Sequence, residues 1–248
     1  MEDKKKRVII AMPAYNAGRT LEATVRALPV QYDEILLCDD GSNDDTFLRS
    51  ERLGITTVKH KKNRGYGANQ KTLYALAMQK EAEIIVMVHP DNQYSTERLS
   101  EMIAMIRDDS ADLVIGSRMK TALENNMPWW KYVGNRFLSG LQNFIFQSSL
   151  SEFHSGLRVY NARILNFMPL HTFSDDFVFD AEVIAWCVAN NYRIREVPAE
   201  CYYNSSVSSV NFRRSVKYGF ATLRTLGRYI RGVYSRESKI DQTNIWRV

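Results

Sequence analysis

Residues 34–46 read EILLCDDGSNDDT, an apolar run that ends abruptly in acidic residues, a glycine and a threonine. Residues 35–38 are all apolar, as in a strand that is buried on both faces of a sheet. Ser42 and Asp44 are typical helix N-cap residues, and residues 46–53 have the spacing of a short helix. The stretch therefore predicts a buried strand, a polar turn and a helix, which is the repeating unit of an α/β sheet.

The same alternation extends on both sides of this stretch. Apolar runs typical of buried strands occupy residues 7–12, 34–38, 55–59, 84–88 and 113–117. Helical patterns separate most of them, at residues 20–28, 44–53, 67–80 and 96–107. This order predicts an α/β fold with a mostly parallel sheet that is flanked by helices.

The second half of the chain is less regular. We expect helices over residues 130–147, 176–190 and 211 to about 236, with strands at residues 157–160 and 193–197. No internal repeat and no linker composition interrupts the chain. We therefore expect one domain over residues 1–210, followed by a helical extension over residues 211–248.

Composition narrows the class of protein. Of 248 residues, 45% are apolar and 25% are charged, which is ordinary for a globular domain. Cys38, Cys187 and Cys201 are too few and too far apart for a disulfide framework or a zinc knuckle. The apolar run near the N-terminus is broken at Pro13, and no run is long enough to span a membrane. We expect a cytoplasmic protein.

Polar motifs follow the expected strands. They are P-A-Y-N at residues 13–16, D-D-G-S-N-D-D-T at 39–46, H-P-D-N-Q at 89–93 and G-S-R at 116–118. Each alone has an ordinary interpretation as a turn or a helix cap. In open α/β sheets, however, ligands bind beyond the carboxyl ends of the strands. Taken in order, the motifs predict one ligand site at that edge.

The ordered set resembles the family-2 glycosyltransferases with the GT-A fold, and especially the dolichyl- or polyprenyl-phosphate sugar synthases and their bacterial relatives. The resemblance also includes N-R-G-Y-G-A-N at residues 63–69, F-H-S-G-L-R-V-Y at 153–160 and F-V-F-D-A-E at 177–182. It extends over about residues 7–230 and implies a GT-A, Rossmann-like sheet with a nucleotide-sugar donor.

The resemblance implies a donor site in the first half of the chain. Its residues would be Pro13, Ala14, Tyr15, Asn16, Asp39, Asp40, Gly65, Gly67, Lys71 and Arg118. Asp40, with Asp39 beside it, would bind the base, and the glycines would let the backbone approach the nucleotide. Ala17 stands where the family often has a glutamate, which removes one expected donor contact.

The family's metal motif, Asp-x-Asp, corresponds here to His89-Pro90-Asp91, so an imidazole replaces the first carboxylate. The resemblance implies Asp91, Gln93 and His89 as ligands of a divalent cation that neutralises the leaving diphosphate. Imidazole suits Mn²⁺ better than Mg²⁺, so we expect Mn²⁺ or Mg²⁺ with a preference for Mn²⁺. A histidine that only hydrogen-bonds a loop is the alternative for His89.

The resemblance also implies an acceptor side. Arg118 and Arg136 match two basic contacts to the donor diphosphate and the acceptor phosphate. The acceptor segment would be formed by His154, Ser155, Gly156 and Arg158. For Arg136, a solvated position on a helix surface is the alternative interpretation.

Asp180 and Glu182 match the position of the family's acceptor-side carboxylate, which acts with Asp91 and Arg118 in catalysis. A hydroxyl acceptor needs a base to remove its proton. A phosphate acceptor does not, because its second pKa is about 6 and its oxygens are already ionised near neutral pH. The alternative role is an acidic residue at a helix N-terminus.

The C-terminal extension has an amphipathic pattern. Apolar residues from Phe212 to Val233 recur at helical spacing beside a stripe of arginines and lysines. A basic amphipathic helix is typical of a peripheral membrane contact, here through residues 211–236, or of packing on the domain. We expect the former, at the inner face of the membrane.

The sequence thus predicts a metal-dependent inverting glycosyltransferase that moves a sugar from a UDP- or GDP-sugar to a polyprenyl phosphate. Two alternatives remain, transfer to a growing surface glycan and a non-catalytic nucleotide-sugar or lipid-phosphate binding subunit. A homodimer or a membrane partner subunit is compatible with the sequence. The net charge of +5 and the lack of a recognition motif argue against a nucleic-acid partner.

Overall fold

A computed structural model describes residues 6–29, 32–202 and 212–235. For residues 212 and 213 it describes the helical backbone but not the side chains. The first half alternates strands and helices as expected. Its elements are β1 (Val8–Ala14), α1 (Leu21–Ala27), β2 (Glu34–Asp39), α2 (Thr46–Arg52), β3 (Thr56–Lys59), α3 (Tyr66–Gln79), β4 (Ile84–Met87), α4 (Leu99–Arg107) and β5 (Leu113–Ser117).

The second half holds two more strands and the longest helices. Its elements are α5 (Trp129–Phe146), β6 (Arg158–Asn161), two short 3₁₀ segments (Ala162–Asn166 and Leu170–Thr172), α6 (Phe179–Ala189), β7 (Ile194–Pro198) and α7 (Phe212–Ile230). Residues 236–248 of the expected C-terminal extension lie outside the described residues.

The strands form one seven-stranded sheet in the order β3-β2-β1-β4-β6-β5-β7. Neighbouring strands are parallel except at β6, which is antiparallel to both β4 and β5. The mostly parallel α/β sheet is therefore confirmed. Direction changes beside β4, so the polar residues that follow β4 lie at a switch point of the sheet, where α/β proteins bind ligands.

Apolar side chains alternate across the sheet and fill a core on each face. On one face, Ile9 and Ala11 of β1 pack in a cluster with residues of α3 and α6. On the other face, Ile10 and Met12 pack in a cluster with residues of α4. Strands β1, β2, β4 and β5 are buried on both faces, which explains their continuous apolar sequences, whereas the edge strands β3 and β7 are partly exposed.

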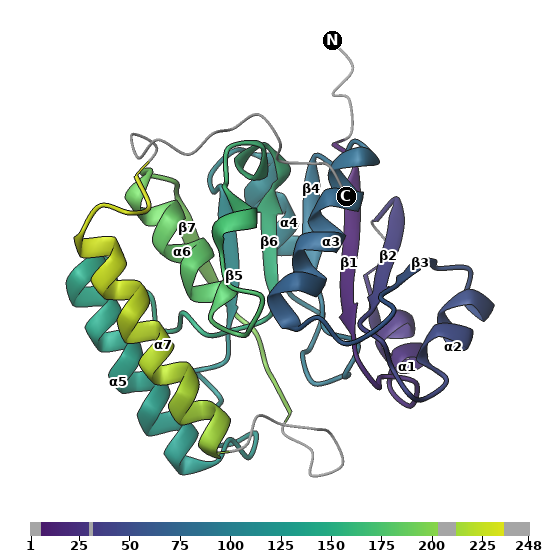
Figure 1. Ribbon diagram of the computed structural model, residues 1–248, viewed down its shortest axis with the longest axis horizontal. Coiled ribbons are helices and arrows are strands. Elements are labelled where there is room, and N and C mark those ends of the chain that lie inside the picture. The colour runs from purple at the N-terminus through teal and green to yellow at the C-terminus, as the bar shows by residue number, and fades with distance from the viewer. Residues whose placement is uncertain (1–5, 30–31, 203–211, 236–248) are drawn as a thin grey trace.

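Helices α5 and α7 lie side by side at the edge of the molecule that is at the left of Figure 1. They run parallel, since Gly219 lies beside Leu138 and, further along both helices, Tyr229 packs on Phe146. We call these two helices the α5–α7 layer. Helix α7 also packs against α6, which connects the layer to the core.

Several element boundaries differ from the sequence expectation. Strand β1 extends through Pro13 and Ala14, so Ala14 pairs with Asp39 in the parallel ladder. Helices α4 and α6 begin three residues later than expected. The residues before them form single turns, with backbone bonds from Leu99 to Thr96 and from Phe179 to Asp176.

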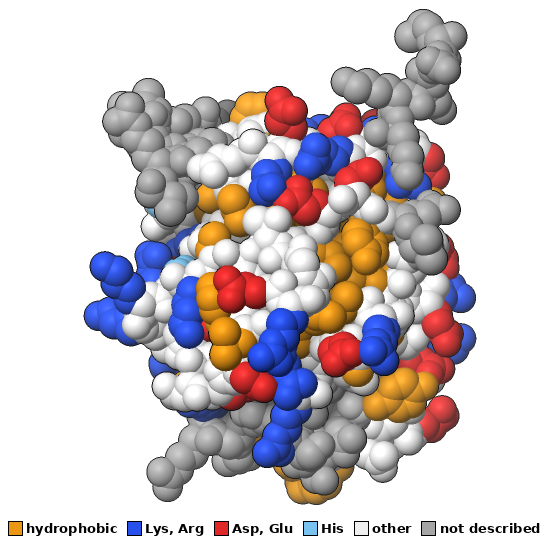
Figure 2. Space-filling model, turned by 90° about the vertical axis from the view of Figure 1, so that its right-hand side faces the viewer, with side chains coloured by type: hydrophobic (Ala, Val, Ile, Leu, Met, Phe, Trp, Pro, Cys, Tyr) orange, Lys and Arg blue, Asp and Glu red, His pale blue; other side chains and the backbone are white. Residues whose placement is uncertain are grey.

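No helix in the part of the chain that the structure describes is long and apolar enough to cross a membrane. The three cysteines are buried, and no disulfide joins them. Figure 2 shows the side of the molecule where α1 and α2 lie, and acidic and basic side chains are interspersed over it.

Candidate active site

The carboxyl ends of β1 and β2 bring the first two polar motifs together. Asn16 adopts a left-handed conformation (φ 54°), and its amide donates to Ser42 Oγ at 2.8 Å. Its side-chain oxygen accepts from the Asn43 amide at 3.0 Å. Tyr15 is 51% exposed, whereas Pro13 and Ala14 are buried within β1. The exposed ring of Tyr15 is therefore the part of the first motif that a base can reach.

Asp39 has one carboxylate oxygen without a hydrogen-bond donor. Its Oδ1 accepts from the Ser42 amide at 2.9 Å, while Oδ2 is buried with no hydrogen bond and has the Lys59 ammonium 3.5 Å away. Buried polar oxygens normally have a donor. The unfilled position at Asp39 suits an N–H group of a ligand.

Asp40 is fully engaged within the protein. Its carboxylate interacts with His60 Nδ1 at 2.6 Å and accepts the backbone amides of Arg64 at 2.9 Å and Gly65 at 3.0 Å. These bonds hold residues 60–65 in place. The expected base contact therefore fits Asp39 better than Asp40.

The two glycines at the start of α3 allow another segment of the chain to approach closely. A Cβ on Gly65 (φ 104°) would lie 2.5 Å from the Asp175 carbonyl oxygen, and one on Gly67 would lie 2.3 Å from the Ser174 carbonyl oxygen. Lys71 donates to the Phe173 carbonyl at 2.5 Å and to Asp175 at 2.8 Å. These three residues hold segment 173–175 against α3, and their predicted contact with the nucleotide stays a prediction.

The residues after β4 form the candidate metal position. Asp91 Oδ1 accepts from the Gln93 amide at 3.1 Å, and burial raises the pKa of Asp91. Burial lowers the pKa of His89, and its Nε2 lies 3.2 Å from the Tyr66 hydroxyl. The described residues contain no group of three or more His, Cys, Asp or Glu side chains that forms a complete metal site.

His89 joins a polar cluster built from four elements. Tyr66 of α3 donates to Asp180 Oδ2 at 2.8 Å, and Gln70 donates to Asp180 Oδ1 at 3.1 Å. Arg158 of β6 lies 3.3 Å from the same Oδ1. We call Tyr66, Gln70, His89, Arg158 and Asp180 the Asp180 cluster. It connects α3, the end of β4, β6 and α6 at the switch point of the sheet.

Arg158, which was predicted to lie on the acceptor side, is occupied by partners within the protein. Its side chain is fully buried, and its guanidinium donates to the carbonyls of Phe153 and Ser155 as well as pairing with Asp180. A buried guanidinium needs such partners, because an unpaired one is very costly. Arg158 therefore positions Asp180 and segment 153–155.

Asp180 and Glu182 face different partners, although both lie in the first turn of α6. Glu182 accepts from the Ser174 amide at 2.6 Å and from the Tyr234 hydroxyl at 3.2 Å, and it pairs with Arg228 of α7. Glu182 thus connects α6 to the C-terminal helix, whereas Asp180 belongs to the cluster that includes His89.

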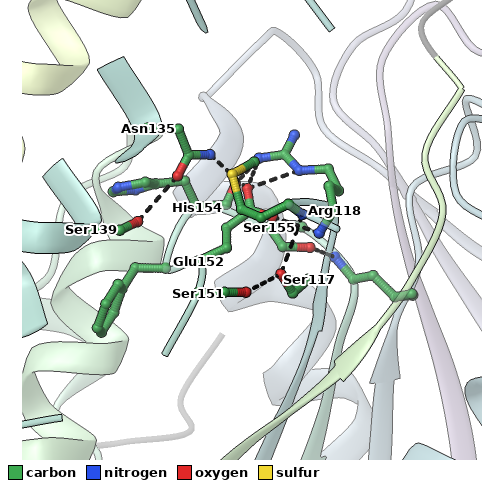
Figure 3. A network of polar contacts seen from close by, with 12 residues as sticks. Ser117, Arg118, Asn135, Ser139, Ser151, Glu152, His154 and Ser155 are labelled. Atoms are coloured by element: carbon green, nitrogen blue, oxygen red, sulfur yellow. Dashed lines mark hydrogen bonds and ion pairs between the residues drawn. The ribbon is translucent and has the colours of Figure 1, made fainter. Parts of the chain in front are cut away.

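Arg118 is held by a buried carboxylate that sequence reasoning missed. Its backbone amide donates to Glu152 Oε2 at 2.8 Å, and its Nε donates to Oε1 at 2.9 Å (Figure 3). Glu152 is fully buried; burial raises its pKa, but Arg118 and the hydrogen bond from Asn135 together outweigh this and lower it. Asn135 of α5 donates to the same Oε1 at 2.8 Å. This network fixes Arg118 at the end of β5.

Segment 154–156 reaches the same edge of the sheet. His154 Nδ1 lies 2.7 Å from the Tyr218 hydroxyl, and burial lowers the pKa of His154 to about 4. The amide of Gly156 and the hydroxyl of Ser155 contact the Tyr94 hydroxyl at 3.1 and 3.3 Å. A Cβ on Gly156 would lie 2.4 Å from His89 Nε2, so this glycine lets the segment approach His89.

Arg136 lies apart from this arrangement. It is exposed on α5, one residue beyond Asn135, whose side chain points into the Glu152 network (Figure 3). A step of about 100° per residue turns Arg136 away from that network. The structure therefore brings together Arg118, His154, Ser155 and Gly156, and it leaves Arg136 on the outer surface.

Three supporting residues, Tyr66, Gln70 and Glu152, were not predicted. Tyr66 stands inside the N-R-G-Y-G-A-N motif, and Glu152 directly precedes F-H-S-G-L-R, so both were adjacent to residues that were singled out. Their partners lie 114 and 34 positions away in sequence. Only the assembled sheet reveals these pairings.

Comparison with known proteins agrees with the fold and the motifs. Residues 9–167 match the glycosyl transferase family 2. The UDP-N-acetylglucosamine–dolichyl-phosphate N-acetylglucosaminyltransferase of Methanococcus voltae is 28% identical over 217 residues, which are 80% of this chain and 86% of that protein. The low-salt glycan biosynthesis hexosyltransferase Agl6 of Haloferax volcanii is 28% identical over 67% of this chain and 39% of its own length.

Solved structures share the fold. Glucosyl-3-phosphoglycerate synthase of Mycobacterium tuberculosis superposes with a TM-score of 0.71 at 16% identity, covering 91% of this chain and 81% of that one. A structure of that enzyme in complex with Mn²⁺, UDP-glucose and phosphoglyceric acid has a TM-score of 0.70 at 15% identity, covering 90% and 80%. The family match covers more than half of the chain, which belongs to glycosyl transferase family 2 and is a glycosyltransferase with a GT-A-like fold.

Proposed function

We infer that this glycosyltransferase moves a sugar, with inversion, from a UDP- or GDP-sugar to a polyprenyl phosphate, and that a divalent metal assists the transfer. The observation that carries the inference is the meeting of Asp91 and the Asp180 cluster, which includes His89, at the switch point of the sheet. At the end of β2, Asp39 Oδ2 is buried without a hydrogen bond. The donor base would lie near Tyr15 and Asp39, with the diphosphate towards Asp91 and Arg118.

The residues after β4 fit a metal that the donor helps to hold. Asp91 is a half-buried carboxylate with no ion pair to a lysine or arginine among the described residues, and Gln93 adds an amide oxygen two residues on. Mg²⁺ and Mn²⁺ are commonly held by one or two protein carboxylates together with substrate phosphates. The metal supplies positive charge that stabilises the leaving diphosphate. His89 would favour Mn²⁺ if it is a ligand.

The engaged carboxylates of α6 favour a phosphate acceptor. Asp180 is bound by Tyr66, Gln70 and Arg158, and Glu182 is bound by Ser174, Arg228 and Tyr234. Both oxygens of each carboxylate already have partners within the protein, which argues against a role as the base for a hydroxyl acceptor. A phosphate acceptor needs no such base, because its oxygens are already ionised near neutral pH. The relative that acts on dolichyl phosphate supports the same choice.

The acceptor phosphate would approach from the side of His154, Ser155 and Gly156. His154 Nε2 is buried and has no hydrogen-bond partner in the described structure, so it is a polar atom at which an oxygen ligand would be stabilised. Its pKa of about 4 keeps the imidazole neutral near pH 7. It would therefore contribute a hydrogen bond rather than a charge.

Transfer to a growing glycan is the second candidate, and the likeness to Agl6 favours it. A lipid acceptor would place the enzyme at the cytoplasmic face of a membrane, with peripheral contact through residues 211–236, alone or with a partner subunit or second copy. A glycan acceptor carries no such requirement.

The test is release of free nucleotide from a panel of UDP- and GDP-sugars, with Mn²⁺, Mg²⁺ or EDTA, and with or without a short polyprenyl phosphate. We expect metal-dependent release that the lipid stimulates. Metal-dependent release that the lipid does not stimulate would favour the glycan acceptor. Release that does not require the metal would contradict the assignment of Asp91 as a metal ligand.

A further inference from the structure

Helix α5 has polar residues on its inner side and apolar residues on its outer side. Asn135, Ser139 and Gln142 are buried and lie three or four residues apart, on one face of the helix. On the opposite face, Phe137 is 66% exposed and Phe144 is 83% exposed. A helix on the surface of a water-soluble domain has the reverse distribution, so the outer face of α5 is suited to a non-aqueous environment.

The apolar face includes several large side chains on both helices of the α5–α7 layer. On α5 its exposed residues are Trp129, Val133, Phe137 and Phe144, and on α7 they are Val216, Phe220, Leu223 and Ile230. Within each helix, successive residues of this set are three, four or seven positions apart, so they lie on one face. On α5, the exposed Gly140 lies on the same face between Phe137 and Phe144. Since the helices are parallel neighbours, the two stripes form one contiguous apolar surface, unlike scattered single residues, which are normal.

Charge on this surface has one sign. Neither α5 nor α7 contains an aspartate or a glutamate. Arg136 lies at the α5 edge of the apolar surface, and Arg224 and Arg231 lie at its α7 edge; all three are exposed and form no ion pair with the described residues. The side of the molecule with α1 and α2 carries both signs of charge instead (Figure 2).

We propose that the outer face of the α5–α7 layer rests on an anionic lipid bilayer, with the apolar stripes of both helices among the acyl chains and the flanking arginines at the headgroups. Buried apolar area together with basic side chains is what binds an amphipathic helix to such a surface. A second copy of this chain fits less well, because the two basic edges would face each other without acidic partners.

The geometry connects this surface to the site. Asn135 projects from the inner side of α5 into the Glu152 network that holds Arg118 (Figure 3). Tyr218 of α7 contacts His154, and Arg228 of α7 pairs with Glu182. The inference deepens the proposed function, because a lipid-borne phosphate would reach the site from the side that these two helices form.

Binding is tested with the full chain and vesicles that contain neither polyprenyl phosphate nor nucleotide, so the result does not depend on the proposed reaction. We expect sedimentation with mixed phosphatidylcholine–phosphatidylglycerol vesicles, and a blue shift of tryptophan fluorescence that Trp129→Phe diminishes. The double variant Phe137→Ser/Phe144→Ser lowers the vesicle partition coefficient at least about tenfold.

Leu48→Ser is the matched control, since Leu48 is 55% exposed on α2 and outside this surface; its partition coefficient stays unchanged. Arg224→Gln and Arg231→Gln each weaken binding to the anionic vesicles about fivefold and leave binding to neutral vesicles unaltered. Thermal unfolding of each variant shows that it is folded.

Three results would overturn the inference. They are no binding to any vesicle, binding that the double phenylalanine variant does not weaken, and a dimer in solution that this variant dissociates. The last result would assign the surface to a second copy of the chain.

Discussion

The Asp180 cluster and the α5–α7 layer distribute polar groups in opposite ways. In the cluster, Tyr66, Gln70 and Arg158 surround one carboxylate, so each charge has a fixed partner. In the layer, buried polar residues of α5 support the site from behind while phenylalanines face outward. The two regions therefore have different roles. The fixed polar side chains of the Asp180 cluster are suited to catalysis, whereas the exposed apolar face of the α5–α7 layer is suited to binding an apolar partner.

The largest effect of a single substitution is expected at the metal position. Asp91→Asn removes the negative charge that would hold the cation, so we expect turnover to fall by about a thousandfold, in keeping with the several kcal/mol that a catalytic metal contributes. Nucleotide release at saturating Mn²⁺ measures the loss. Glu97→Gln, an exposed change in the same loop, is the control and should retain full turnover. Equal rates for the two variants would refute the metal assignment.

Gly156→Ala disturbs the contact between segment 154–156 and His89. The new Cβ would clash with His89 Nε2, so the imidazole must shift, which disturbs its contact with the Tyr66 hydroxyl. We expect turnover to fall by roughly ten- to a hundredfold, as for other displacements near a reacting centre.

Gly134→Ala provides the matched glycine control for that variant. No atom lies within 4 Å of a Cβ at Gly134, which is in the middle of α5. The control should gain up to about 1 kcal/mol in the free energy of unfolding, through helix propensity, and keep its activity. Full activity of Gly156→Ala would show that the position of His89 does not matter.

Glu182→Gln separates the two carboxylates of α6. Loss of the charge-assisted contact with Arg228 should lower the free energy of unfolding by about 1–3 kcal/mol and detach α7 from α6, while kcat is largely retained. Thermal unfolding and nucleotide release on the same preparation measure both quantities. A large fall in kcat in a protein of unchanged stability would instead place a catalytic base at Glu182.

The smallest effect is expected at the end of the sheet away from the site. Burial raises the pKa of Asp112, but hydrogen bonds from Arg193 and Arg163 outweigh it and lower that pKa to about 2. A lowered pKa means that the ionised form stabilises the fold above about pH 4, and that this contribution is lost as the pH falls towards 2.

Asp112→Asn should therefore cost about 1 kcal/mol at pH 7, since both arginines are partly exposed and screened by solvent. The difference from the parent should vanish near pH 2. Acid unfolding monitored by circular dichroism provides the measurement, and a difference that does not depend on pH would exclude the ionic contribution.

The parallel half of the fold was predictable because β1, β2, β4 and β5 are buried on both faces and appear as continuous apolar runs. Strand β6 was found as a strand, but its antiparallel direction was not, since the run at residues 157–160 carries no sign of direction. The boundaries of α4 and α6 were placed early because single turns and first helical turns use the same residue types.

The site was predictable only where a motif directly follows a strand. Asp39, His89, Asp91 and Arg118 are such residues, and the structure places them at the ends of β2, β4 and β5. For Lys71 and Arg158 the ligand contacts stay predictions, but the structure adds ion pairs with Asp175 and Asp180 that the sequence did not indicate. Sequence shows that a charge is present, but its partner depends on segments that meet only in the folded chain.

The most direct test is transfer of a labelled sugar from UDP- or GDP-sugars into organic-extractable lipid, with short polyprenyl phosphate as acceptor and with Mn²⁺ or EDTA. The account predicts labelled lipid only with metal, and none from Asp91→Asn. Nucleotide release without labelled lipid, from any donor in the panel, would contradict the lipid-phosphate acceptor.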